Sequence, residues 1–141
     1  VLSLVERALG TLQGTNIAAL GLAYTPHVAA LRESPAVEVV HLLQDAGASV
    51  KAFEPFAPKA TLSGINTVPS IEEALAETDA ILLLVAHNQF KELDAKNIAK
   101  MMKGRVAVDA INGWDVEKWQ EAGFALTRLG VGKLKGDRTL L

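Results

Sequence analysis

The apolar run from Ala80 to Ala86 constrains the fold of this chain more than any other feature of its sequence. Its segment AILLLV, over 80–85, is continuously apolar, whereas a strand with one solvated face alternates apolar and polar side chains. A strand that is buried on both faces is typical of the centre of a parallel sheet. The run is also far shorter than the roughly 20 residues that a membrane span needs. The sequence therefore predicts an interior strand of a parallel sheet, and no membrane partner.

Shorter apolar segments alternate with segments of helical spacing along the rest of the chain. Strands are expected over 16–20, 49–53, 65–68, 80–85, 106–108 and 124–126. A helix is expected over 3–13, and further helices should begin at the capping residues Ser34, Ser70, Asp94 and Asp115. These helices should end before Gly47, near Glu77, before Gly104 and near Trp119. The predicted fold class is α/β: a Rossmann-like three-layer α/β/α domain with a mainly parallel sheet, preceded by the end of a helix.

The length of 141 residues fits one domain with short extensions. We expect residues 1–14 to be the end of a helix, 15–128 to form the domain, and 129–141 to be a tail. The first residues lack the basic-then-apolar order of a signal peptide, and no initiator Met is present. The chain is therefore expected to be a segment of a longer protein.

Charge and cysteine content narrow the partners and the chemistry. The chain has 14 basic and 16 acidic side chains and a net charge of −2, so it offers no basic excess for nucleic acid or an anionic membrane. It has no cysteine, which excludes a disulfide, a thiolate metal site and a cysteine nucleophile within it. No histidines or carboxylates have metal-ligand spacing, so no metal is expected. The absence of cysteine is compatible with a cytoplasmic location, which we expect.

Polar residues gather where the predicted strands end. Ligands of open parallel sheets bind outside the carboxyl ends of the strands, and these ends are the segments 21–34, 54–55, 86–90 and 109–114. The polar residues there are Tyr24, Thr25, His27, Arg32, Glu33, Glu54, His87, Asn88, Gln89, Asp109 and Asn112. All loops are rich in polar residues, so this gathering has an ordinary alternative. We interpret it as a binding edge because the fold brings these loops together.

The first loop argues against a dinucleotide site in this chain. Such a site needs Gly-x-Gly-x-x-Gly directly after the first strand, so that the backbone can approach the pyrophosphate. The segment GLAYTP over 21–26 has one glycine, and the next helix begins well downstream at Ser34. We therefore expect a Rossmann-like fold that does not bind NAD. The amides after Ser34 still form a helix N-terminus suited to an anion.

The same loop carries a family resemblance. GLAYTPHVAALRESP over 21–35 resembles the GLAFKPxxDDxRESP signature of the C-terminal domain of the UDP-glucose/GDP-mannose dehydrogenase family. FEP over 53–55, AHNQFK over 86–91 and VDAING over 108–113 resemble further segments of that family, in the same order. The Glu-Pro pair and the His-x-Gln-Phe-Lys pattern are most similar to UDP-N-acetyl-D-mannosamine dehydrogenases. The resemblance covers roughly residues 3–127.

The resemblance implies an enzyme of three parts, used in polysaccharide biosynthesis. An N-terminal domain, absent here, would hold NAD and the catalytic cysteine, and residues 1–14 would end a central helix that forms a homodimer. Residues 15–128 would close over a UDP-sugar, whose C6 alcohol is oxidised to a carboxylate by two hydride transfers to NAD. This chain alone would hold no catalytic residue. Its expected UDP-sugar contacts are Tyr24, Thr25, His27, Arg32, Glu54, His87 and Asn112.

Several positions depart from the family pattern. The lysine after the aromatic residue is Thr25, two aspartates are Ala29 and Ala30, an acidic residue is Ala86, and a basic residue is Ile111. Charge-assisted hydrogen bonds to a diphosphate are lost with the lysine and the basic residue. A freestanding nucleotide-binding or interaction module without catalysis is therefore the alternative. An ordinary NAD(P)-binding domain is a third hypothesis, disfavoured by the missing glycines.

Several candidate residues also have a structural interpretation. Fixing a loop is the structural alternative to a ligand contact for Arg32 and for Glu54. The structural alternative for His87 is a histidine satisfied by backbone groups. We expect Ser34 to be a helix cap and His41 to be solvated. Trp114 and Trp119 are expected to be packing residues.

Overall fold

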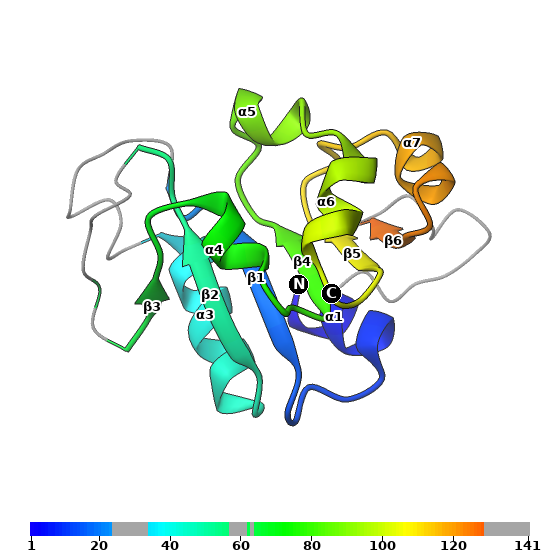
Figure 1. Ribbon diagram of the computed structural model, residues 1–141. Coiled ribbons are helices and arrows are strands. Elements are labelled where there is room, and N and C mark those ends of the chain that lie inside the picture. The colour runs from blue at the N-terminus through cyan, green and yellow to red at the C-terminus, as the bar shows by residue number, and fades with distance from the viewer. Residues whose placement is uncertain (24–33, 57–61, 63, 129–141) are drawn as a thin grey trace.

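The computed structural model describes residues 1–23, 34–56, 62 and 64–128, and it shows one sheet flanked by helices (Figure 1). The strands are β1 Asn16–Leu20, β2 Ser49–Phe53, β3 Asn66–Thr67, β4 Ala80–Leu83, β5 Val106–Asp109 and β6 Ala125–Arg128. The helices are α1 Leu2–Leu9, α3 Pro35–Asp45, α4 Ile71–Leu75, α5 Asn88–Lys91, α6 Ala95–Met101 and α7 Val116–Glu121.

The six strands form a parallel sheet in the order β3-β2-β1-β4-β5-β6. Ile17 of β1 pairs with Val50 of β2 on one side and with Ala80 of β4 on the other. This order is that of the doubly wound Rossmann fold, in which the chain reverses its direction of travel between β1 and β4. The predicted fold class is confirmed.

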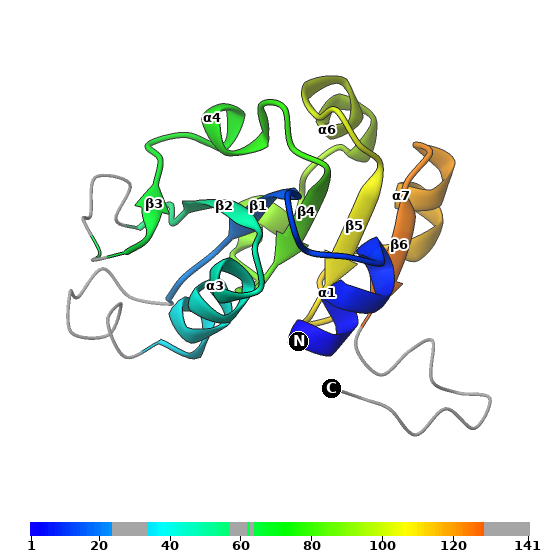
Figure 2. The ribbon, with the colours of Figure 1, turned by 90° about the horizontal axis from the view of Figure 1, so that it is seen from below.

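Helices cover both faces of the sheet (Figure 2). α1 and α3 pack on one face, against a cluster that includes Ile17, Ala19 and Leu82. α4, α6 and α7 pack on the other face, against a cluster that includes Ala18 and Leu20. Neighbouring residues of β1 thus point into two different cores, which explains why the interior strands are apolar throughout rather than alternating.

Helix α1 is shorter than expected and is part of the sheet's cover. The helix predicted over 3–13 ends at Leu9, because Gly10 adopts φ 83° and stops it. Leu4 and Val5 are buried in the same cluster as Val108 of β5. α1 therefore covers the half of the sheet that α3 leaves open on this face (Figure 2).

Other boundaries differ by a few residues. The interior strand ends at Leu83 rather than Val85, because Leu84 and Val85 belong to a loop in which both amides donate to Leu20 O. The strands expected over 65–68 and 124–126 lie at 66–67 and 125–128, and α4 ends at Leu75 rather than near Glu77. The four-residue helix α5 was not expected.

The predicted helix caps are confirmed. Ser34, Ser70, Asp94 and Asp115 each accept a hydrogen bond from a backbone amide in the first turn of α3, α4, α6 and α7, respectively. No helix in the described part of the chain has the length and apolar character to span a membrane.

Candidate functional site

The candidate site lies where β1 and β4 end side by side, at the switch point of the sheet. The loop after β1 begins at Gly21, and the loop after β4 contains Val85 and His87. Gly21 has φ 93°, and a Cβ atom built on it would lie 2.6 Å from Val85 Cβ and 2.9 Å from Val85 N. The two loops therefore touch at Gly21, and only glycine permits both that conformation and that approach.

Glu54 holds the first of these loops from the end of β2. Its side chain is 2% exposed. Oε1 accepts hydrogen bonds from Leu22 N at 2.8 Å and Ala23 N at 2.9 Å, and Oε2 accepts one from Phe56 N at 2.9 Å. A buried carboxylate costs free energy unless donors surround it, and here the backbone supplies three. Glu54 thus fixes a loop, which is the structural alternative that we gave for it from the sequence.

His87 completes the surroundings of this carboxylate. Its Nε2 lies 3.1 Å from Glu54 Oε1 and 3.0 Å from Glu54 Oε2, and the residue is 6% exposed. The ring also lies edge-on to Phe56 and Phe90, with centroid separations of 4.5 and 5.5 Å. The sequence placed Glu54 and His87 on one edge, but it offered backbone groups as the structural partner of the histidine. The structure adds a carboxylate, that of Glu54, as a partner of His87.

Asp109 organises the loop after β5 in a similar way. The residue is fully buried, and its two oxygens accept hydrogen bonds from Ile111 N, Gly113 N and Trp114 N at 2.8–3.1 Å. Asn112, at the tip of this loop, is exposed and adopts φ 57°. Its Oδ1 accepts a hydrogen bond from Arg128 Nε at 3.3 Å. Asp109 therefore presents Asn112 on the carboxyl edge of the sheet.

Ile111 stands where the family pattern has a basic residue, and it is packed rather than solvated. The residue is half-buried and contacts the hydrophobic clusters on both faces of the sheet. Trp114 and Trp119 are buried and stack with ring centroids 4.0 Å apart, so their predicted packing role is confirmed. His41 is exposed, as expected.

Four predicted site residues, Tyr24, Thr25, His27 and Arg32, lie outside the described residues and stay predictions. Ser34, which follows them, caps α3 through Ala36 N at 3.1 Å and donates to Leu22 O. The first loop is thus tied at its far end to the same segment that Glu54 holds. Phe56 was missed in the sequence, although its position two residues after Glu54 places it on this edge.

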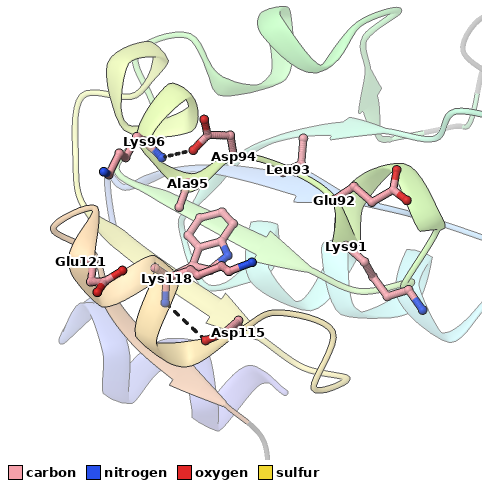
Figure 3. A pocket seen from close by; sticks show the side chains of 10 residues that line it. Lys91, Glu92, Leu93, Asp94, Ala95, Lys96, Asp115, Lys118 and Glu121 are labelled. Carbon is pink, nitrogen blue, oxygen red and sulfur yellow. Dashed lines mark hydrogen bonds between the residues drawn. The ribbon is translucent and has the colours of Figure 1, made fainter.

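A pocket of about 500 Å³ lies away from the switch point, between the α5–α6 segment and α7 (Figure 3). Its lining includes Lys91, Lys96, Lys118, Asp94 and Asp115, but neither Glu54, His87 nor Asn112. Both aspartates are occupied as helix caps. Within the described ranges, no group of three or more histidine, cysteine or acidic side chains is arranged to hold a metal ion.

Residues 18–116 match the model of the UDP-glucose/GDP-mannose dehydrogenase family, UDP binding domain. The chain is 33% identical over 129 residues to a UDP-glucose 6-dehydrogenase of Rhizobium meliloti, covering 89% of this chain and 30% of that protein. It is 35% identical over 121 residues to a UDP-N-acetyl-D-mannosamine dehydrogenase of Methanocaldococcus jannaschii, covering 84% of this chain and 27% of that protein. The chain thus spans less than a third of these relatives' length.

Solved structures share the fold. A UDP-D-ManNAc dehydrogenase of Pyrococcus horikoshii superposes with a TM-score of 0.73 at 26% identity, over 96% of this chain and 30% of that one. An NDP-N-acetyl-D-galactosaminuronic acid dehydrogenase of Methanosarcina mazei Go1 superposes with a TM-score of 0.76 at 24% identity, over 90% of this chain and 27% of that one. The second likeness concerns the fold alone.

Proposed function

The chain belongs to the UDP-glucose/GDP-mannose dehydrogenase family through its UDP-binding domain, and from this membership we propose that it supplies the nucleotide-sugar site of a UDP-sugar 6-dehydrogenase. The observation that carries the proposal is the family match over residues 18–116, which includes all four segments at the carboxyl edge, 21–34, 54–55, 86–90 and 109–114. In the proposed arrangement, residues 15–128 close over UDP. Residues 1–14, which contain α1, end a helix that joins this domain to the rest of a homodimeric, cytoplasmic protein.

The proposed substrate is UDP-N-acetylmannosamine, oxidised at C6 to its uronate. The pattern Glu54-Pro55 with His87-x-Gln89-Phe90 supports this sugar. So does the 35% identity to a relative that bears the name UDP-N-acetyl-D-mannosamine dehydrogenase. Relatives named for UDP-glucose match at 30–34% identity, so the sugar is the finer part of the proposal.

The proposed contacts divide into two groups. Tyr24, Thr25, His27 and Arg32 in the first loop would bind UDP together with Asn112, which is exposed in the loop after β5. Glu54 and His87 would shape the floor of the site, because both are buried and each is held by the other. The loops around the bound nucleotide would be held in place by two buried carboxylates, those of Glu54 and Asp109.

The described part of the first loop does not favour NAD, which the proposed reaction requires. The amides of Leu22 and Ala23 already donate to Glu54, and Gly21 is pressed against Val85. We therefore assign NAD to another domain of the parent protein, and no step of the reaction to the residues of this chain beyond binding and orientation.

Titration of UDP and of NAD into the 141-residue chain tests this assignment. We expect saturable heat with UDP in isothermal calorimetry, and none with NAD below about 1 mM. UDP should bind weakly, because Thr25 and Ile111 replace charged family residues. Micromolar NAD binding would contradict the cofactor assignment, and failure of UDP to bind at all would contradict the nucleotide-sugar site.

A second function is favoured by Ile111. Ile111 packs against both core clusters at a position where the family pattern has a basic residue, and this supports a domain that has lost a charged contact. In that case the domain would be a nucleotide-binding or interaction module without catalysis. The coding sequence upstream of Val1 distinguishes the enzyme from the module. A Gly-x-Gly-x-x-Gly domain and a cysteine nucleophile encoded there belong only to the enzyme.

A further inference from the structure

The carboxylate of Glu54 lies in a cradle of donors that resembles a site for a bound anion. Three backbone amides, those of Leu22, Ala23 and Phe56, point at its two oxygens at 2.8–2.9 Å. His87 Nε2 closes the cradle at 3.0 and 3.1 Å. Convergent backbone amides of this kind form the concavities in which proteins bind phosphate and other anions.

This cradle lies where a dinucleotide-binding Rossmann domain holds its ligand. In a dinucleotide-binding Rossmann domain, the first loop receives the pyrophosphate, and an acidic residue after β2 holds a ribose hydroxyl. Here the acidic residue after β2 has turned onto the first loop itself. The amides of Leu22 and Ala23 are thereby used, and a second anion at the same place would meet the charge of Glu54 at short range.

The cradle has no room for both anions. Glu54 is 2% exposed, so its carboxylate is covered on all sides. Beneath the loop, Gly21 approaches Val85 so closely that even an added Cβ would lie 2.6 Å from Val85 Cβ. The loop therefore cannot move toward β4 to admit a phosphate while Glu54 stays in place.

We propose that Glu54 is a specificity-determining residue: it is an internal anion that occupies the phosphate cradle of the first loop and keeps dinucleotides out of the switch point. Its removal leaves a vacant cradle for a small oxyanion, such as acetate or inorganic phosphate. The first loop is then a Rossmann anion site that the chain fills with its own side chain. UDP, by the same reasoning, places its diphosphate elsewhere on the carboxyl edge.

The substitution Glu54→Ala tests the proposal by chemical rescue. Alanine keeps the Cβ atom and removes a CH₂–COO⁻ group, so acetate matches the missing part. The variant should melt at a lower temperature than the unmodified chain. Acetate at ten times its Kd should then raise the variant's Tm by about 5 °C relative to chloride at equal ionic strength. Pyrophosphate should also raise the Tm of Glu54→Ala. Its affinity for this variant should be at least tenfold higher than its affinity for the unmodified chain.

Two variants control for other effects of acetate. Glu54→Gln fills the same space without a charge, and Glu72→Ala removes an exposed glutamate of α4. Neither should respond to acetate. A folded Glu54→Ala chain that responds no more than these controls would overturn the proposal. If Glu54→Ala does not fold in chloride, refolding in acetate gives the readout, and equal failure in both salts would overturn it. These experiments measure the effects of small anions alone, so their outcome does not depend on whether the chain binds UDP.

Discussion

Gly21 joins the two loops of the switch point, and no other residue type fits its place. Gly21→Ala should lower the free energy of unfolding by about 2–4 kcal/mol, because the new Cβ meets Val85 and φ 93° is strained for alanine. Gly14→Ala is the matched control, since Gly14 has φ 78° and nothing within 4 Å of its Cβ position. It should cost only about 1–2 kcal/mol. Urea unfolding measures both, and equal losses would show that the contact with Val85 is unimportant.

Thr25 is the residue whose change most directly tests an inherited nucleotide site. Thr25→Lys restores the family's ammonium at the first loop. A charged hydrogen bond contributes about 1.5–3 kcal/mol, and ordering the side chain costs up to about 2 kcal/mol. UDP affinity should therefore rise by a factor between one and roughly ten, at unchanged Tm.

Ile111→Lys is the informative counterpart of that variant. Ile111 packs against both clusters, so a lysine there loses apolar contacts and should lower the Tm even if it aids binding. Calorimetry with UDP and thermal melts of both variants separate the effects. If Thr25→Lys shows no detectable UDP binding, the interaction module becomes the better explanation.

Sequence reasoning reached the candidate site only in part. It placed Glu54 and His87 on the carboxyl edge, because both follow apolar strands of a parallel sheet. It did not predict that Glu54 would accept the amides of Leu22 and Ala23, which lie 32 and 31 residues away in the chain. That contact depends on the side-by-side packing of β1 and β2, and no local pattern of residues records the direction of one buried side chain.

At the scale of the elements, the packing of α1 on the sheet could not be predicted from its sequence. Its apolar spacing was interpreted as the end of a helix leading into the domain, yet Leu4 and Val5 are buried against the sheet with Val108. The connection from β4 to β5 and that from β5 to β6 carry their helices on the opposite face. α1 therefore fills a layer that the right-handed crossovers leave open on its own face.

Val5→Asp tests the place of α1 in the core. The substitution buries an unpaired carboxylate at a residue that is 1% exposed, and we expect a loss of about 3–5 kcal/mol in unfolding free energy. Glu6→Ala, on the exposed side of the same helix, should change stability by less than about 0.5 kcal/mol. Chemical denaturation with circular dichroism measures both. Similar stability of the two variants would mean that α1 is only a linker.

The element boundaries that the sequence missed have local causes. The apolar run 80–85 continues past the last ladder pair, since Leu84 and Val85 turn toward Leu20 while remaining buried. Burial and strand pairing therefore end at different residues, and only burial is visible in a hydrophobic pattern. α5 has four residues, too few to show a helical period. Capping residues, by contrast, act locally, and Ser34, Ser70, Asp94 and Asp115 all cap as predicted.

At the scale of the whole molecule, every strand that carries a candidate residue ends at one edge of a single parallel sheet. β1, β2, β4 and β5 are adjacent in the order β2-β1-β4-β5, so their terminal loops form one continuous row. Glu54 and Asp109 fix loops at the two ends of this row, each through three backbone amides. Two buried carboxylates therefore hold the described loop segments at both ends of this row.

The proposed assignment of NAD to another domain leads to the last prediction, which concerns catalysis by the chain alone. Oxidation of an alcohol to a carboxylate in the resembled enzymes needs a thiolate to capture the aldehyde and a domain to hold NAD. The chain has no cysteine, and the amides of its first loop are occupied by Glu54. We expect no formation of NADH, followed by its absorbance, when the pure chain is mixed with NAD and either UDP-glucose or UDP-N-acetylmannosamine. The parent protein, measured under the same conditions, is the positive control. NADH production by the 141-residue chain would show that catalysis resides in this domain, and it would overturn the assignment of NAD to another one.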